Sequence, residues 1–306
     1  MKVSIIGAGR NRSGIGEYVG KYFQKNGAEV VSVLGRTEET SRKASLNLQR
    51  YGIKPNSYAD LHEMVERERP DVVVIASPSS THYDYLVTCV DLGLNIFCEK
   101  PFLSPDLDDV KGRIENILQK AKDKRLTLAM NSQWPFALGY YKKICGEIGI
   151  KKSNRFFISL SPFTSGKEMI SEAVPHALSL LYSVVGEGEI GNLAFESPKE
   201  EEMTIRFRYL FGKKECEVLI KLAGKKEQPR EFLFGFNDKI VKRSLNLRNY
   251  DIYFNYGNRK WKIGDPLNLS VRDFIKAVGK RCEPFVGYSH ILSTTSLLKI
   301  IYDGYH

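Results

Sequence analysis

The chain has 306 residues, of which 42% are hydrophobic and 27% are charged, with a formal net charge of +10. This composition is ordinary for a globular protein, and the length exceeds the usual size of one hydrophobic core, so two domains are expected. No apolar run approaches the roughly 18 residues of a membrane span, and no charged segment with a long apolar stretch opens the chain, which disfavours secretion and membrane insertion.

The basic surplus lies mainly in the second part of the chain. Residues 1–130 carry 19 Lys and Arg against 17 Asp and Glu, and the remainder carries 27 against 19. The basic residues of the second part are spread among acidic and apolar ones, without the aromatic-interleaved stripe of nucleic-acid readers. No nucleic acid is therefore expected as a partner. A solvated surface or an anionic small substrate accounts for the charge.

Five scattered cysteines show neither a CxxC pair nor a histidine at zinc-like spacing. This pattern argues against a disulfide framework and a structural metal, so no metal is expected and a reducing cytoplasm is the expected location. The cysteines are Cys89, Cys98, Cys145, Cys216 and Cys282.

A strand over residues 2–6 is followed by the glycine-rich segment GAGRNRSGIG and a helical pattern through about residue 25. Gly7 permits a tight turn, and Gly9 lets the backbone approach a pyrophosphate held by the helix N-terminus. The spacing departs from GxGxxG, because Arg12 stands where the third small residue is expected. The alternative is a strand–helix turn without a ligand. The expected cofactor contacts here are Gly7, Gly9, Arg10, Arg12, Gly14 and Ile15.

The end of the second strand, residues 29–34, predicts the choice of cofactor. It leads into Gly35-Arg36-Thr37 and a helix over residues 38–50 that Thr37 caps. Folds that prefer NAD place an acid here for the ribose hydroxyls, whereas an arginine accommodates the 2′-phosphate of NADP. This chain has no acid at that point, so Arg36 and Thr37 favour NADP over NAD.

The same alternation of strand and helix continues to about residue 130. Strands are expected over residues 54–58, 71–76, 94–99 and 126–131, and helices over residues 60–68, 82–92 and 105–124. Together with the first two strands they predict a six-stranded, doubly wound parallel sheet, a Rossmann domain over residues 1–130.

The segment LNIFCEKP places Glu99 and Lys100 at the end of an apolar strand, just before Pro101 stops the ladder. Ligands of open α/β sheets bind at the carboxyl ends of the strands, so an ammonium group here would meet a substrate. The alternative is a strand-end salt bridge followed by a proline turn.

Residues 131–306 predict a second, α+β domain. After a helix over residues 135–146, several segments alternate apolar and polar side chains, which is typical of a mainly antiparallel sheet with one covered face. One helix, residues 175–185 with Pro175 at its first position, is expected to cover it. The strands are expected over 155–160, 204–210, 216–222, 231–236, 240–245 and 252–256, and closing helices over 270–280 and 289–302.

The sheet of this second domain is expected to leave one face open, which favours a homodimer or homotetramer formed through that domain. Several strands place apolar or aromatic side chains on both sides, more than one covering helix can bury completely. They are Phe207, Tyr209, Phe232, Phe234 and Phe236.

The chain resembles the Gfo/Idh/MocA oxidoreductases, the glucose-fructose oxidoreductase and inositol dehydrogenase family. Family-like segments occur in the expected order: GAG, ASPSSTH, CEKP, ICGEIG, EAVPHALSLL and VRDFIKAVGK. The resemblance implies a Rossmann domain followed by an open-faced sheet domain, a nicotinamide cofactor, and hydride transfer at a hydroxyl or carbonyl carbon of a sugar or cyclitol. It also implies that Ser77, Pro78, His82, Glu99 and Lys100 line the cofactor.

The resemblance further assigns the chemistry to three residues. His176 stands at the histidine of the family's DxGxH motif and would transfer the substrate's proton, while Lys100 would bind and stabilise the same oxygen. Glu172 stands where the family usually has aspartate and would orient the imidazole or bind a second hydroxyl. The alternative for His176 is a buried histidine at a helix start, bonded to a backbone carbonyl.

Gln133 and Trp134 follow the last Rossmann strand, where the family places a substrate-contacting segment, although a core tryptophan fits equally. The family's glycine run is replaced by the bulkier, charged residues 165–170, so a different substrate mouth is expected. An NADP-dependent oxidoreductase of a sugar-like, possibly anionic substrate is the leading hypothesis. A catalytically inactive cofactor-binding regulator or sensor and a purely structural protein are the alternatives.

Overall fold

The computed structural model describes residues 1–9 and 14–306, so the expected contacts Arg10 and Arg12 lie outside the described residues. The chain forms two compact units, Met1–Asn131 with Leu267–Ile291, and Ser132–Pro266 with Leu292–His306. The sequence predicted one boundary, at residue 130. In the structure the first unit also includes a segment from the last sixth of the chain.

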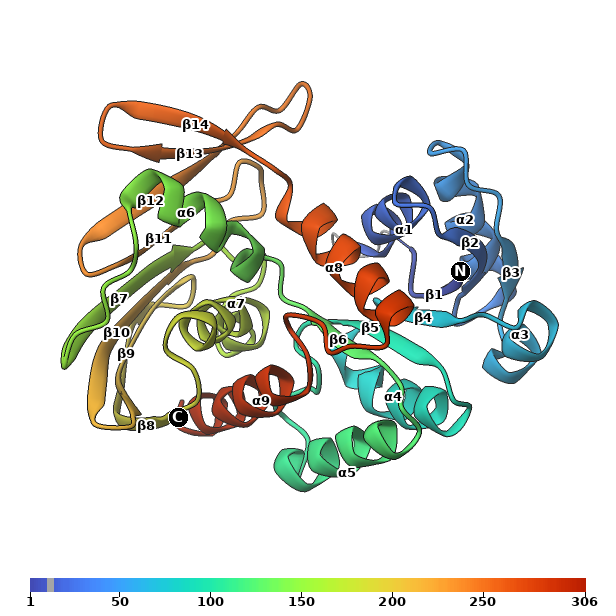
Figure 1. The fold of residues 1–306 in the computed structure, drawn as a ribbon, viewed down its shortest axis with the longest axis horizontal. Helices are drawn as coiled ribbons and strands as arrows, with labels where there is room; N and C mark the ends of the chain where they lie inside the picture. Colours follow the sequence, from blue (N-terminus) through green and yellow to red (C-terminus); the bar gives the residue numbers. More distant parts are fainter. Residues whose placement is uncertain (10–13) are drawn as a thin grey trace. The chain divides into compact units, whose positions relative to one another are not determined.

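The first unit is built on a six-stranded parallel sheet with the order β3-β2-β1-β4-β5-β6 (Figure 1). The predicted doubly wound sheet is confirmed. Its strands are β1 (Lys2–Ile6), β2 (Glu29–Leu34), β3 (Asn56–Tyr58), β4 (Val72–Ile75), β5 (Asn95–Glu99) and β6 (Leu128–Asn131). Its helices are α1 (Gly16–Lys25), α2 (Glu38–Gln49), α3 (Leu61–Glu68), α4 (His82–Asp91), α5 (Val110–Asp123) and α8 (Pro266–Lys280).

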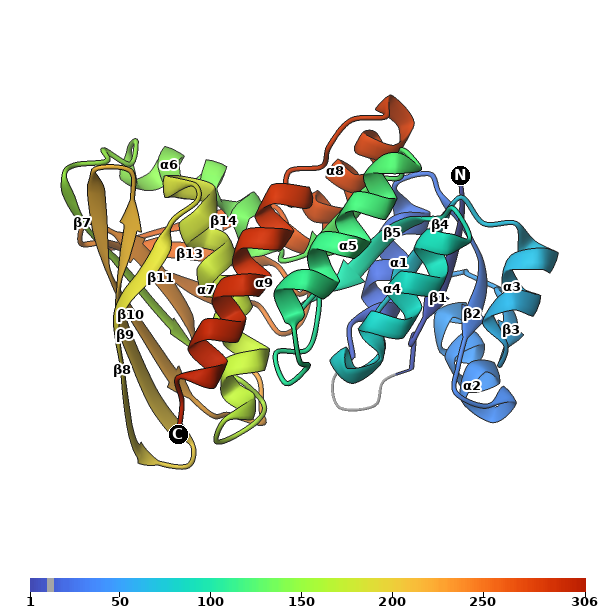
Figure 2. The same ribbon diagram turned by 90° about the horizontal axis from the view of Figure 1, so that it is seen from below.

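Both faces of this sheet are covered, which explains why β4 consists of four buried apolar residues. Helices α1, α2 and α8 lie on one face and α4 and α5 on the other (Figures 1 and 2). Phe274 of α8 lies 6.1 Å from Phe23 and 5.3 Å from Phe97, measured between ring centroids. This aromatic contact packs α8 onto the first sheet. Because α8 is distant from the sheet in the chain, no local sequence pattern predicts the contact.

The second unit contains an eight-stranded sheet with the order β14-β13-β12-β11-β7-β10-β9-β8. Its strands are β7 (Ser153–Leu160), β8 (Glu189–Lys199), β9 (Glu202–Phe211), β10 (Lys214–Ala223), β11 (Phe232–Phe236), β12 (Lys239–Leu245), β13 (Ile252–Tyr256) and β14 (Arg259–Ile263). Only the β7–β10 pair of this sheet runs parallel among the described residues, so the mainly antiparallel sheet is confirmed. Strands β8 and β14 were not expected from the sequence.

Three helical segments, not one, cover the inner face of this sheet. They belong to α6 (Leu138–Cys145), α7 (Glu168–Val185) and the later part of α9 (Tyr288–Asp303), which contribute Tyr141, Leu178 and Ile301 to one core. Figure 2 shows all of them on the same side of the sheet. The expectation of a single covering helix was wrong because α9 returns from the far end of the chain.

Pro175 lies inside α7, not at its first position, and His176 is likewise in mid-helix. A proline within a helix costs about 3 kcal/mol, because it lacks the N–H and crowds the preceding turn. Several apolar residues before it, among them Met169 and Val174, are fully buried, and this burial outweighs the local cost.

The aromatic residues expected on both sides of the sheet all lie on its inner side. Phe207, Tyr209, Phe232, Phe234 and Phe236 are each at most 3% exposed. Their partners in the alternation, such as Arg206, Arg208 and Lys242, are exposed on the outer side. The period of two therefore places these five aromatic residues on the covered face, so they do not contribute to an oligomer surface.

Among the described residues, no helix is both long and apolar enough to cross a membrane. No group of three or more His, Cys, Asp or Glu side chains is placed to hold a metal ion in the described part of the chain.

Candidate functional site

The order of the first sheet reverses between β1 and β4, and ligands of such sheets bind outside the carboxyl ends of the strands at that point. Gly7 follows β1 with φ at 84°, and a Cβ there would lie 2.5 Å from the amide nitrogen of Ser77. Only glycine fits, because both the left-handed conformation and the close approach exclude a side chain. The turns after β1 and β4 are thus packed backbone to backbone.

Gly9, two residues after Gly7, is not packed against described atoms. A Cβ on Gly9 would meet no described atom within 4 Å, so packing within the described protein does not require this glycine. Ile15, at the N-cap of α1, makes no side-chain capping hydrogen bond. The positive end of the α1 dipole lies here, and it favours an anion. Gly14 and Ile15 are half-buried just before the helix. These features fit a dinucleotide pyrophosphate.

At the end of β2, the packing and capping of α2 explain why a glycine stands at position 35 and a threonine at position 37. A Cβ on Gly35 would lie 2.5 Å from the amide nitrogen of Ser41. Thr37 and Thr40 form a reciprocal capping box, with Thr40 N donating to Thr37 Oγ1 at 3.2 Å. Arg36 is exposed, and the carboxylate of Glu38 is paired with Arg42 at 2.8 Å. A guanidinium group therefore stands at this strand end, and Glu38, the nearest acid in sequence, is paired with Arg42.

His82 joins the turns that follow β4 and β5. Its Nδ1 lies 2.9 Å from the carbonyl oxygen of Pro101, and its Nε2 lies 2.9 Å from that of Ser77. The ring is 1% exposed, and burial lowers its pKa. Both ring nitrogens thus face backbone carbonyls, so His82 holds the SPSSTH turn, with Ser77 and Pro78, against the turn that carries Lys100.

Glu99 and Lys100 end β5, and the peptide bond between Lys100 and Pro101 is cis. The Glu99 carboxylate accepts a hydrogen bond from Asn131 Nδ2 at 2.7 Å, which joins the ends of β5 and β6. Burial raises the pKa of Glu99, opposed by the neighbouring Lys100 ammonium. Lys100 itself is half-buried at the carboxyl edge of the sheet.

In the second unit, Glu172 and His176 lie one turn apart on α7, on the same side of the helix. The Glu172 carboxylate accepts hydrogen bonds from the backbone N–H groups of Phe163 and Thr164 at 2.8 to 3.0 Å, and from Thr164 Oγ1 at 3.0 Å. Both of its oxygens therefore hold the loop after β7. His176 is half-buried in the middle of the helix.

Gln133 is half-buried at the N-cap of the short 3-10 helix η3 (Trp134–Ala137). Trp134 is 3% exposed and stacks on Phe232, with ring centroids 3.7 Å apart and an angle of 19° between the planes. Both faces of such a stacked, buried indole are enclosed by protein. The geometry of Trp134 is that of a core residue.

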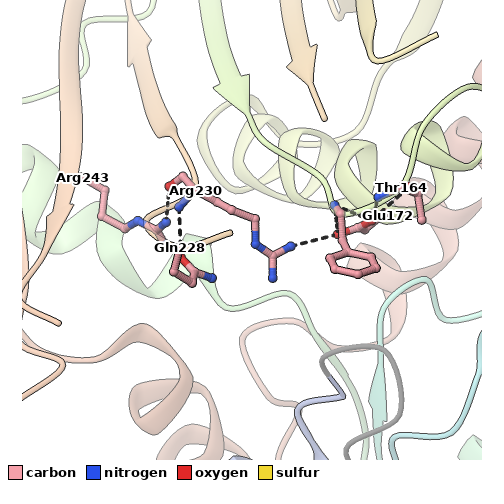
Figure 3. A network of polar contacts seen from close by, with 6 residues as sticks. Thr164, Glu172, Gln228, Arg230 and Arg243 are labelled. Carbon is pink, nitrogen blue, oxygen red and sulfur yellow. Dashed lines mark hydrogen bonds and ion pairs between the residues drawn. The ribbon is translucent and has the colours of Figure 1, made fainter. Parts of the chain in front are cut away.

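Two arginines that sequence reasoning did not single out connect these positions (Figure 3). Arg230 Nη1 lies 3.4 Å from Glu172 Oε1, and Arg243 Nη2 donates to the Arg230 carbonyl oxygen at 2.6 Å. The Arg243 guanidinium lies 5.6 Å from the centroid of the Trp134 ring. A signal existed in the sequence, because Arg243 occupies an inward-facing position of its strand, two residues after the buried Val241.

The sheet order and the glycine turn at its switch point define a dinucleotide-binding Rossmann protein. Residues 1–132 match the sequence model of the Gfo/Idh/MocA family, described as an oxidoreductase family with an NAD-binding Rossmann fold. Over this region the predicted resemblance to the Gfo/Idh/MocA oxidoreductases is confirmed.

Known proteins similar to this chain are sugar and polyol dehydrogenases. An inositol 2-dehydrogenase of Azotobacter vinelandii is 32% identical over 79 residues, which cover 26% of this chain and 22% of that protein. A D-glucoside 3-dehydrogenase of Escherichia coli is 29% identical over 101 residues, which cover 33% of this chain and 27% of that protein. The matched part thus spans about a quarter of the length of these relatives.

Among solved structures, the fold is similar to that of UDP-N-acetylglucosamine 3-dehydrogenase from Acidithiobacillus ferrooxidans. The TM-score is 0.71 at 16% sequence identity, and the likeness covers 99% of this chain and 97% of that chain. The expected fold class is therefore confirmed along nearly the whole sequence.

Proposed function

We propose that this protein is an oxidoreductase that transfers a hydride between NADP(H) and a hydroxyl-bearing or carbonyl carbon of a sugar-like, polyhydroxylated molecule. The observation that carries the proposal is the position of Gly7 and Gly9 before the N-terminus of α1 at the β1–β4 switch point, with Lys100 at the same carboxyl edge. The dehydrogenases of inositol, a D-glucoside and a UDP-sugar that resemble this chain support the substrate class.

The first unit would hold the cofactor through its strand ends. The N–H groups of α1, with Gly7, Gly9 and Gly14, would bind the pyrophosphate, and Arg36 with Thr37 would bind the 2′-phosphate of NADP. Ser77, Pro78 and Glu99 would line the nicotinamide side. The nicotinamide ring, when bound, supplies the acceptor or donor of the hydride.

Two side chains of this protein would manage the substrate's oxygen. Lys100 would donate a hydrogen bond to it and stabilise the negative charge that develops when the O–H proton leaves. His176 would take that proton in oxidation and return it in reduction, because a neutral imidazole can do both near neutral pH. Glu172 would act by holding the loop after β7, and Gln133 would contact the substrate.

A panel of sugars, cyclitols and sugar phosphates, each offered with NAD and with NADP and followed at the nicotinamide absorbance, tests the proposal. Turnover of at least one polyhydroxylated compound is the expected result. Tight cofactor binding without turnover of any member would favour the alternative, a catalytically inactive regulator or sensor of the same fold. Failure to bind either cofactor would contradict both.

A further inference from the structure

The strongest unexplained feature of the second unit is a pair of arginines on the inner side of its sheet. Arg243 lies on β12, and Arg230 lies just before β11 (Figure 3). The Arg230 side chain is 21% exposed and its partner Glu172 is 25% exposed, while Arg243 is half-buried. Two partly buried guanidinium groups therefore lie on this side of the sheet, and one of them is paired with a carboxylate.

That carboxylate is shared among many donors. Glu172 accepts hydrogen bonds from two backbone N–H groups and a hydroxyl of the Phe163–Thr164 loop, besides the ion pair with Arg230. Glu231, next to Arg230 in sequence, is bound on the outer side of the sheet to Ser159 at 2.9 Å and to Lys242 at 3.6 Å. One positive charge of the arginine pair thus has no carboxylate of its own among the described residues.

Arg243 is held in a fixed orientation. Its guanidinium lies 5.6 Å from the ring centroid of Trp134 and 5.8 Å from that of Phe232, and these two rings stack on each other. Within the described residues its one hydrogen bond, to the Arg230 carbonyl, uses one of five N–H donors. Burial and the charge of Arg230 lower the pKa of Arg243 to about 10, so the group stays cationic at neutral pH.

A half-buried, oriented guanidinium with spare donors is costly unless an anion binds it, and its planar fork matches a carboxylate or a phosphate. The position also agrees with such a role. Arg243 contacts Trp134, the neighbour of Gln133, and Arg230 contacts Glu172, which lies one helical turn from His176.

We infer that the substrate carries an anionic group, a carboxylate or a phosphate, that Arg243 binds with the help of Arg230. The inference rests on the proposed function for the identity of the bound molecule as the substrate. The negative charge of this group would distinguish the substrate from neutral inositols and glucosides.

Calorimetric titration without any nicotinamide tests the inference, with glucose, glucuronate, glucose 6-phosphate and inorganic phosphate as probes. We expect at least one anionic sugar to bind at least about tenfold more tightly than glucose. Arg243→Gln should remove this advantage. Lys242→Gln is the matched control, because it removes the same charge from the adjacent residue, whose side chain lies on the outer side of the sheet. Glucuronate and glucose 6-phosphate distinguish a carboxylate from a phosphate.

Equal affinity of the wild type for glucose and both anionic sugars overturns the inference, as does binding of no anion at millimolar concentration. An equal effect of Arg243→Gln and Lys242→Gln also overturns it and leaves Arg243 a packing residue. If Arg243→Gln does not fold, the wild-type affinities for neutral and anionic sugars still test the inference. Arg243→Lys and Arg230→Gln then replace Arg243→Gln as the test variants. Charge-dependent binding without turnover would refute the proposed function alone, whereas turnover of neutral sugars without an anion preference would refute this inference alone.

Discussion

Lys100 and His176 carry different parts of the proposed chemistry. Lys100 ends a buried strand, and the clamp of His82 on the Pro101 carbonyl fixes the turn in which it stands. His176 projects from the middle of α7, an 18-residue helix anchored in the core on both sides of it. Both residues therefore stand on rigid elements, as reacting groups require.

We predict that Lys100→Met and His176→Ala each lower kcat by about two to four orders of magnitude, while the Kd of the cofactor stays nearly unchanged. The physical reason is that both groups act on the substrate oxygen and neither is expected at the phosphates. Steady-state kinetics and cofactor titration measure the two quantities. Lys111→Met, on the exposed side of α5, is the control. Near-normal kcat in either variant would remove that residue from the mechanism.

Arg36 decides the choice of cofactor in our proposal. We predict that NADP(H) binds at least about tenfold more tightly than NAD(H), because a charge-assisted contact is worth about 1.5 to 3 kcal/mol. Arg36→Ala should abolish most of the difference. Calorimetric titration of both cofactors measures it, with Arg67→Ala as control, since Arg67 pairs with Glu63 on α3. Equal affinities in the wild type, or an unchanged ratio in Arg36→Ala, would contradict this assignment.

At the scale of single elements, α9 carries a buried histidine that makes stability depend on pH. His290 is 4% exposed, and burial lowers its pKa to about 3. The folded state therefore keeps His290 neutral, whereas the unfolded chain binds a proton as the pH falls below about 6.5. The contribution of His290 is fully present above that value and is lost as the pH falls towards 3. His82 acts in the same direction, because its pKa is also lowered.

Lowering the pH from 7 to 5 should decrease the free energy of unfolding of both proteins. We predict that the decrease is about 2 kcal/mol larger in the wild type than in His290→Gln. Urea titration followed by circular dichroism at both pH values measures the difference. His62→Gln is the control, because it removes an exposed histidine of α3 by the same substitution. An identical pH dependence in wild type and His290→Gln would show that His290 is not kept neutral by the fold.

At the scale of the whole molecule, the open face of the second sheet remains our proposed surface for a homodimer or homotetramer. Its composition changes the kind of interface to expect. The outer side chains form ion pairs such as Arg206–Glu196 and Arg208–Glu215, with Leu210 and Ile240 exposed among them at 42% and 39%. An interface here would be polar with a few apolar contacts, and therefore weakened by salt.

We predict that light scattering at micromolar concentration detects a dimer or tetramer, and that Leu210→Glu shifts it to monomer. A buried acidic side chain without a partner is unfavourable in any interface that covers this strand. Leu46→Glu is the control, because Leu46 is 63% exposed on α2 in the first unit. A monomer in the wild type would overturn the proposal, and an unchanged oligomer in Leu210→Glu would move the interface elsewhere.

The sequence alone determined the parallel sheet, the mainly antiparallel second sheet and the resemblance to the Gfo/Idh/MocA oxidoreductases. These follow from local signals: apolar runs bounded by glycine turns, a period of two, and short motifs such as GAG and EKP in a fixed order. The positions of Lys100, Arg36 and Gly7 at strand ends followed from the same signals. Each of these features depends on residues close together in the chain, so a window of sequence contains the information.

Tertiary structure alone decided the features that depend on distant residues. Phe274 packs α8 onto the first sheet, and α9 helps to cover the second, because apolar burial is not tied to chain position. Apolar burial also explains why α7 continues past Pro175 and why Trp134 lies in the core. Arg230 meets Glu172 of α7 through its side chain and Arg243 of β12 through its backbone carbonyl. These contacts join residues that are far apart in the chain, so a short stretch of sequence holds no information about them.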